Sequence, residues 1–203
     1  MLRRAFLVCG LFVGLGAGAA TAAAAESAPW PCAQPRTPTI SAASVWAGPD
    51  IAKAGDWQND SEAAALAQEL ASRRTPLSNV DGLLDAFVKK VGPADKDLRL
   101  TRVFAGALAL INDERDKVVS GISRFAEGQQ LLAERVRKDG ENVADDQQDG
   151  PSKAKALADA QTKFAWDKRI FTERSQSLKY VCETPGILEH RIFVIARSIQ
   201  QRL

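Results

Sequence analysis

The sequence predicts an all-α protein of about five helices, with a globular helical head and a long antiparallel, coiled-coil-like hairpin. Three observations lead to this prediction. Apolar residues recur at spacings of three and four through most of residues 60–203. No segment shows the alternation typical of strands, and one helical stretch runs from about residue 95 to 138 without a strong stop signal.

Residues 1–25 have the pattern of a secretory signal peptide. Arg3 and Arg4 precede an apolar stretch, and small residues lead to a cleavage point near Ala25. Cleavage removes two basic residues, so the 27 Lys+Arg and 25 Asp+Glu of the whole chain become equal in number. We therefore expect an exported protein that does not bind nucleic acid, and no second apolar stretch is long enough to span a membrane.

The mature chain keeps two cysteines, because Cys9 lies inside the signal peptide. In an oxidising compartment Cys32 and Cys182 are most simply a disulfide. A metal site needs more ligands than these two and His190, and there is no CxxC redox motif. The predicted bond ties the start of the mature chain to a late helix, and a loop of this length stabilises by roughly 5 kcal/mol in the chain-entropy model.

Residues 26–59 are expected to form an extended arm that is docked on the head. Five of the nine prolines lie here, which excludes a long helix. Trp30, Trp46 and Trp57 also lie here, and a disordered tail rarely carries so many large apolar rings. These rings are interpreted either as packed on the head or as an aromatic surface for a peptide or glycan.

Residues 60–203 form the expected helical domain. Two short helices come first, and residues 95–138 and 152–183 then form the hairpin around a polar turn at 139–151. Thr184-Pro185-Gly186 is expected to break the chain before a final helix. Within the hairpin, the 3-4 spaced seam is interrupted by two polar residues, Arg115 and Gln129.

Apolar residues beside the hairpin seam widen the apolar surface beyond one partner helix. They are Val119, Leu131 and Ala133. One interpretation keeps this surface inside the hairpin, and the other uses it for self-association or for a protein partner.

The concentrated charge of the sequence lies at the expected turn, where five acidic residues occur with no Lys or Arg between 139 and 149. Glu141, Asp145, Asp146 and Asp149 are candidate ligands for Ca²⁺ or another hard cation, which prefers oxygen donors. The EF-hand-like start at Asp145 fails at its twelfth position, where Ala156 replaces the bidentate Glu. An ordinary acidic turn is the alternative.

Catalytic motifs are absent from the sequence. His190 is the one histidine, and there is no nucleophile elbow, HExxH motif, haem attachment site or phosphate-binding loop. We therefore expect a protein that is not an enzyme and that needs no organic cofactor. The expected function is an exported interaction, adaptor or chaperone-like protein, and the alternative is binding of a ligand or hard cation by the acidic turn or the Trp-rich arm.

Residues 30–49 resemble the N-terminal signature of an uncharacterised family of exported helical proteins of Gram-negative bacteria. The residues that carry the resemblance are Trp30-Pro31-Cys32, Gln34, Pro38, Ser41 and Trp46-x-Gly48-Pro49. The resemblance implies a periplasmic setting. It implies no activity and assigns no functional residue.

Overall fold

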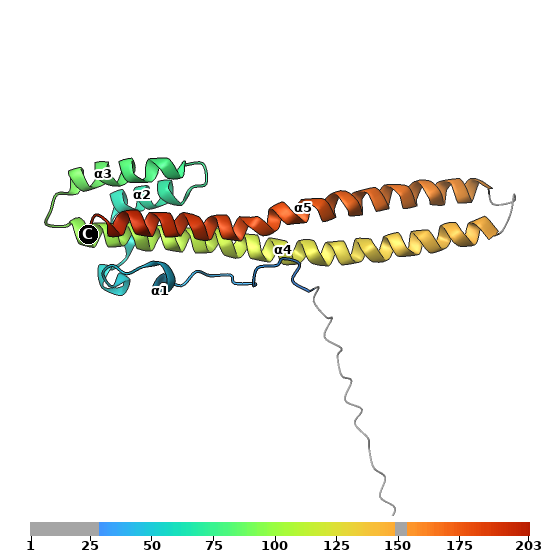
Figure 1. Ribbon diagram of the computed structural model, residues 1–203, viewed down its shortest axis with the longest axis horizontal. Coiled ribbons are helices and arrows are strands. Elements are labelled where there is room, and N and C mark those ends of the chain that lie inside the picture. Colours follow the sequence, from blue (N-terminus) through green and yellow to red (C-terminus); the bar gives the residue numbers. More distant parts are fainter. Residues whose placement is uncertain (1–28, 149–153) are drawn as a thin grey trace, which may run out of the picture.

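The computed structural model describes residues 29–148 and 154–203, and this part of the chain is all-α, which confirms the predicted fold class. Two helices run the length of the molecule: α4, Lys96–Gln148, and α5, Ala154–Gln200. They are roughly 80 and 70 Å long at about 1.5 Å per residue. Figure 1 shows them antiparallel, with the other elements gathered at one end. The described chain is therefore a head with a projecting hairpin.

The head is built where two short helices pack on the pair formed by α4 and α5. α2 spans Ser61–Ala71 and packs mainly on α4, and α3 spans Val80–Val91 and also contacts α5. The 3₁₀ turn η3, Leu77–Asn79, connects them. The fully buried side chains of the head come from all four helices and include Leu70, Leu84, Leu100, Phe104, Ile111, Leu188, Ile192, Ile195 and Ile199.

The arm lies on the other side of the head from α2 and α3 (Figure 1). It contains the short helix α1, Ala42–Val45, and the 3₁₀ turns η1, Ile51–Ala54, and η2, Trp57–Asn59. The amide of Asn112 on α4 accepts a hydrogen bond from the Ile40 N–H (2.7 Å) and donates one to its carbonyl (3.1 Å). The expected signal peptide, residues 1–25, lies outside the described residues.

Two tryptophans of the arm belong to the core of the head. Trp46 stacks on Phe104 of α4, with ring centroids 4.0 Å apart. Trp57 lies over Gly106 of α4, beside Ala67 of α2. A Cβ atom at position 106 would lie 2.7 Å from the Trp57 ring and 2.8 Å from the Ala67 Cβ. The close approach of arm, α2 and α4 therefore depends on a glycine at this position.

The expected break at Thr184-Pro185-Gly186 is wrong, because α5 continues through it and joins the expected fourth and final helices. Proline removes one helical hydrogen bond, the one to the carbonyl of Val181. The buried guanidinium of Arg115 on α4 donates to the carbonyl oxygens of Pro185 and Thr37, so it ties α5 to α4 and to the arm beside the proline. Figure 1 shows α5 changing direction part-way along its length, as a proline within a helix predicts.

The expected turn at 139–151 is also corrected, because α4 continues past Lys138 to Gln148. Two polar residues that indicated a turn instead face α5. Asp139 is buried and pairs with Lys163, and the backbone of Gly140 lies against the ring of Phe164. The sequence pattern is typical of a loop, but contacts from the opposite helix stabilise nearly three further turns of helix.

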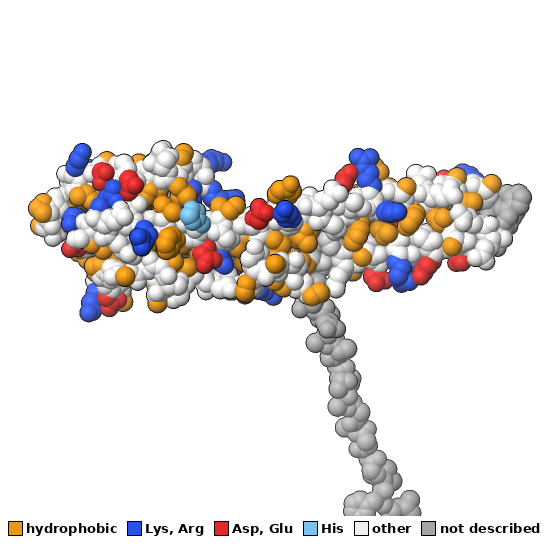
Figure 2. Space-filling model, in the orientation of Figure 1, with side chains coloured by type: hydrophobic (Ala, Val, Ile, Leu, Met, Phe, Trp, Pro, Cys, Tyr) orange, Lys and Arg blue, Asp and Glu red, His pale blue; other side chains and the backbone are white. Residues whose placement is uncertain are grey.

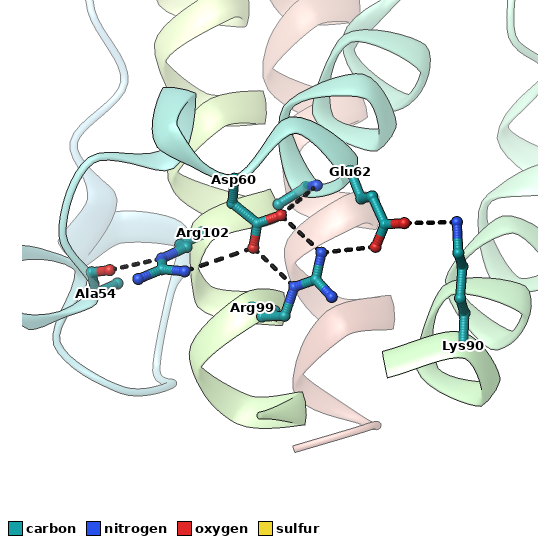
Figure 3. Close-up of polar contacts among 7 residues, drawn as sticks. Ala54, Asp60, Glu62, Lys90, Arg99 and Arg102 are labelled. Carbon is teal, nitrogen blue, oxygen red and sulfur yellow. Dashed lines mark hydrogen bonds and ion pairs between the residues drawn. The ribbon is translucent and has the colours of Figure 1, made fainter. Parts of the chain in front are cut away.

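A set of ion pairs fastens the start of α2 to α4 (Figure 3). The buried carboxylate of Asp60 caps α2 by accepting from the Ala63 N–H (3.1 Å). It also accepts two hydrogen bonds of 2.7 Å from Arg99 and lies 3.5 Å from Arg102. The Arg99 guanidinium is the main reason that the pKa of Asp60 falls to about 2, and the same contact raises the pKa of Arg99.

The same ion pairs extend to α3 and to the arm. Glu62 lies between Arg99 (2.8 Å) and Lys90 of α3 (2.6 Å), and these two cations lower its pKa. Arg102 donates to the carbonyl oxygen of Ala54 in η1 (2.8 Å). Side chains of the first turns of α4 thus connect this helix with α2 and η1, and through Glu62 with α3 (Figure 3).

We predict that Gly106→Ala lowers the free energy of unfolding by about 1–3 kcal/mol, because the new methyl group overlaps Trp57 and Ala67. The matched control is Gly82→Ala on α3, where no atom lies within 4 Å of a Cβ. It should raise stability by about 0.5–1 kcal/mol. Urea denaturation followed by circular dichroism measures both, and a neutral Gly106→Ala would contradict the packing described.

We predict that Asp60→Asn lowers the free energy of unfolding by roughly 2 kcal/mol at pH 7. Asparagine can still cap α2, so the loss comes from the ion pairs with Arg99. Because the folded-state pKa is depressed, this stabilisation is present above about pH 4 and is lost as the pH falls through about 2. Denaturation curves of the two proteins should therefore converge between pH 4 and 2.

The control for this prediction is Asp56→Asn. Asp56 accepts a turn hydrogen bond from the Gln58 N–H at 2.9 Å and forms no ion pair with the described residues. Its change should be a few tenths of a kcal/mol at every pH. Equal effects of the two substitutions would show that the ion pairs do not stabilise the head.

Candidate functional site

The part of the hairpin beyond the head consists of two helices that pack on each other, with no third helix of the described chain beside them. Ile122 and Leu132 of α4 are buried in their seam, but Phe164, Phe171 and Leu178 of α5 are only half-buried. A pair of helices covers the facing stripe of each partner and leaves both flanks of the seam open. The two flanks of this hairpin differ in what covers them.

One flank is covered by the arm. Trp30 lies beside Ala126 and Ala133 of α4 and Ser175 of α5, and its indole N–H donates to the carbonyl oxygen of Gln34 (2.7 Å). A groove of about 320 Å³ remains here. The residues lining it are mainly apolar: Pro29, Trp30, Pro31, Ala126, Gln129, Gln130, Ala133, Phe171, Ser175 and Leu178.

The disulfide between Cys32 and Cys182 holds the arm on this flank. It joins the arm to α5, with the two Cα atoms 5.5 Å apart. Farther along the arm, Thr37 and Ile40 are held by Arg115 and Asn112 of α4. The chain itself therefore occupies this side of the hairpin from the head to Trp30.

The other flank carries the ion pairs that cross between the helices. Arg135 of α4 pairs with Asp167 of α5 at 3.1 Å, and Lys163 pairs with Asp139. Residues at 3-4 spacing from Arg135 and Lys163 form one continuous stripe along each helix. We call the two together the outer stripe: Lys117, Gly121, Arg124, Gly128, Leu131, Arg135, Lys138, Asn142 and Asp145 on α4, and Asp159, Lys163, Trp166, Ile170, Glu173, Ser177, Tyr180, Thr184 and Ile187 on α5.

Exposed apolar side chains concentrate on the outer stripe. Of the six large apolar side chains that are exposed in the described chain, four lie on it: Leu131 (74% exposed), Trp166 (62%), Tyr180 (72%) and Ile187 (54%). The other two lie in the head. Figure 2 shows hydrophobic side chains between charged groups along the hairpin. Helical spacing thus brings apolar groups together where no part of the described chain covers them.

The outer stripe ends where α2 begins to cover the same side of the helices. Arg73, just after α2, lies 3.5 Å from Glu114, which continues the 3-4 spacing of the stripe on α4. On α5 the buried Arg191 donates to the carbonyl oxygens of Leu70 and Thr75 at the end of α2. Burial lowers the pKa of Arg191. The head therefore closes one end of the outer stripe.

The structure separates the three tryptophans that the sequence singled out. Trp46 and Trp57 pack in the head, and only Trp30 lines a groove. Trp166 does not stand out in the sequence, because Phe164 and Phe171, at the seam spacing, dominate the apolar pattern of that helix. Its spacing of 14 residues from Tyr180, which is four helical turns, is the signal that could have found the outer stripe.

The candidate metal ligands lie on α4 near its end instead of in a turn. Glu141 pairs with Arg137 at 2.5 Å, Asp145 is exposed, and Asp149 lies outside the described residues. Within residues 29–148 and 154–203, no group of three His, Cys, Asp or Glu side chains is arranged to hold a metal ion. His190 is exposed on α5. No helix in the described ranges is both long and apolar enough to cross a membrane.

Comparison with known proteins adds no relative. No family model matches the sequence, and no curated protein or solved structure is significantly similar to it.

We predict that the double substitution Cys32→Ser and Cys182→Ser lowers the free energy of unfolding by up to about 5 kcal/mol, since the bond closes a loop of 150 residues. Urea denaturation measures the loss. Reductant should lower the stability of the native protein to that of the variant and leave the variant unchanged. A native protein insensitive to reductant would contradict the role given to this bond.

Proposed function

We propose that this chain is a non-catalytic interaction protein of the periplasm, acting as an adaptor or chaperone-like module through its hairpin. The signal-like residues 1–25 and the disulfide between Cys32 and Cys182 support an exported protein, because disulfides persist in oxidising compartments. The resemblance of residues 30–49 to exported bacterial proteins supports the periplasm.

The observation that carries the proposal is the outer stripe. Leu131, Trp166 and Tyr180 are each more than 60% exposed, although the chain covers the opposite flank with its own arm. Exposed aromatic and aliphatic side chains on one rigid surface are typical of protein interaction sites. Adaptors and chaperone-like proteins need such a surface and no catalytic group.

A second candidate function is ligand binding in the groove beside Trp30. The groove of about 320 Å³ has an aromatic ring and an apolar lining, which suit a small apolar ligand or a peptide side chain. Thermal unfolding in the presence of periplasmic solutes tests this candidate, because a ligand that binds the folded state raises the melting temperature by mass action.

A photo-crosslinking amino acid at Trp166 tests the proposed function in cells. It should give covalent adducts with protein, because the outer stripe is the surface that a partner covers. The matched control carries the same amino acid at Phe193, an exposed aromatic of the head (46% exposed) that lies under Arg197. Absence of adducts at Trp166, or equal adducts at both positions, would contradict an interaction role for the hairpin.

A further inference from the structure

Three large exposed side chains, Leu131, Trp166 and Tyr180, lie at or evenly about the centre of the part of the outer stripe that the head leaves uncovered. On α4 this part extends from Glu114, where Arg73 binds, to the end of the helix at Gln148, and its midpoint is Leu131. On α5 it extends from Arg191 to Ala154. Its midpoint falls between residues 172 and 173, and Trp166 and Tyr180 lie seven residues on either side of 173.

The two midpoints lie at the same level along the hairpin. In an antiparallel pair, moving four residues back along one helix corresponds to moving four residues forward along the other. The ion pair Arg135–Asp167 therefore places residue 131 of α4 level with residue 171 of α5. The hydrogen bond from Gln129 to Ser175 (3.1 Å) likewise places residue 131 level with residue 173. A single axis that runs across the hairpin, from the α4 side to the α5 side, can therefore pass over both midpoints. Leu131, Trp166 and Tyr180 are arranged in matching positions about that axis, whereas Ile187 is matched with Asp159.

We propose that the outer stripe binds a second copy of this chain, antiparallel, with a twofold axis at Leu131, so that two hairpins form a four-helix bundle between two heads. The inference rests on the proposed interaction role of the hairpin and names its partner. Such a twofold axis packs α4 of one copy on α4 of the other, and α5 of one copy on α5 of the other. It brings the two Leu131 side chains together and sets Trp166 of each copy against Tyr180 of the other.

The free length of the hairpin fits this arrangement. From Glu114 to Gln148 the helix rises about 50 Å. This is the length over which two antiparallel hairpins overlap when the end of each reaches the head of the other. Two helices side by side are roughly 15–20 Å wide, so each copy covers on the order of 800–1,000 Å². A stable protein interface needs about 800 Å² per partner. The overlap is therefore large enough for a specific dimer.

The surface at the centre of the stripe allows close approach of a second helix. Gly128 lies one turn from Leu131 and has no atom within 4 Å of a Cβ position. Leu131 of the second copy can fill this space, as a side chain of one helix fills a gap in the facing helix. The glycine that lowers helix propensity here thus has a packing role in the dimer.

Charges at the ends of the stripe complement each other across the axis. Asp145 and Lys117 lie 14 residues on either side of Leu131, so Asp145 of one copy faces Lys117 of the other, which also pairs with Asp113 of its own chain. Arg124 and Lys138, seven residues on either side of Leu131, bring like charges together, so the charge complementarity is confined to the ends of the stripe. Beside Lys117, at the edge of the head, a hollow of about 510 Å³ is lined by Arg73 and Arg74 together with Asp113 and Glu114. Arg74 forms no ion pair with the described residues, so a cation is available where the end of α4 of the second copy meets the head.

Sedimentation of the exported, purified protein tests the inference. The native protein should sediment as a dimer, and Leu131→Glu should raise the dimer dissociation constant by about 30-fold or more, because it buries charge at the axis. The matched control is Leu98→Glu, which changes an exposed leucine of the head (42% exposed) and should leave the dimer intact. Far-ultraviolet circular dichroism spectra with the helix content of the native protein show that both variants fold.

Cysteine crosslinking with a short bismaleimide tests the symmetry. Leu131→Cys should crosslink to itself, whereas a mixture of Trp166→Cys and Tyr180→Cys should crosslink and either alone should not. A native monomer, a dimer that Leu131→Glu leaves intact, or self-crosslinking at position 166 would overturn the inference. If the native protein is a monomer and the photo-crosslinker at Trp166 captures a different protein, only the dimer is overturned. If the photo-crosslinker captures no protein at all, the proposed function is overturned as well.

Discussion

A pair of packed helices cannot cover its own flanks, and this constraint shapes the whole molecule. In the head the flanks of α4 and α5 are covered by α2 and α3 on one side and by the arm on the other. Beyond the head only the arm continues, as far as Trp30, where the disulfide fixes it. The opposite flank is left with apolar side chains exposed. The proposed function and the proposed dimer both follow from this asymmetry.

Polar contacts, as well as apolar packing, hold the two long helices together in the hairpin. Arg115 supports the helix at Pro185, Gln129 bonds to Ser175, and Asp139 pairs with Lys163. Such contacts fix the register of α4 on α5 without removing much apolar surface from water. The hairpin thus keeps a defined shape while its apolar side chains stay available to a partner.

The sequence predicted the all-α class and the hairpin because the 3-4 spacing of apolar residues is a property of each helix alone. It did not predict the helical state of Pro185 or of residues 139–148, because these depend on contacts from the other helix, such as those of Arg115 and Lys163. Leu131 was noted beside the seam. The exposure of Trp166 could not be predicted from the sequence, since it depends on which flank of the hairpin the arm covers.

Small-angle X-ray scattering of the exported protein tests the central claim, that the outer stripe is covered by a second copy, most directly. Two helices of about 80 Å that overlap by about 50 Å give a particle about 110 Å long with a head at each end. The antiparallel dimer predicts a maximum dimension of about 110 Å together with twice the mass of one chain. The mass of a single chain with a maximum dimension of about 80 Å would contradict it.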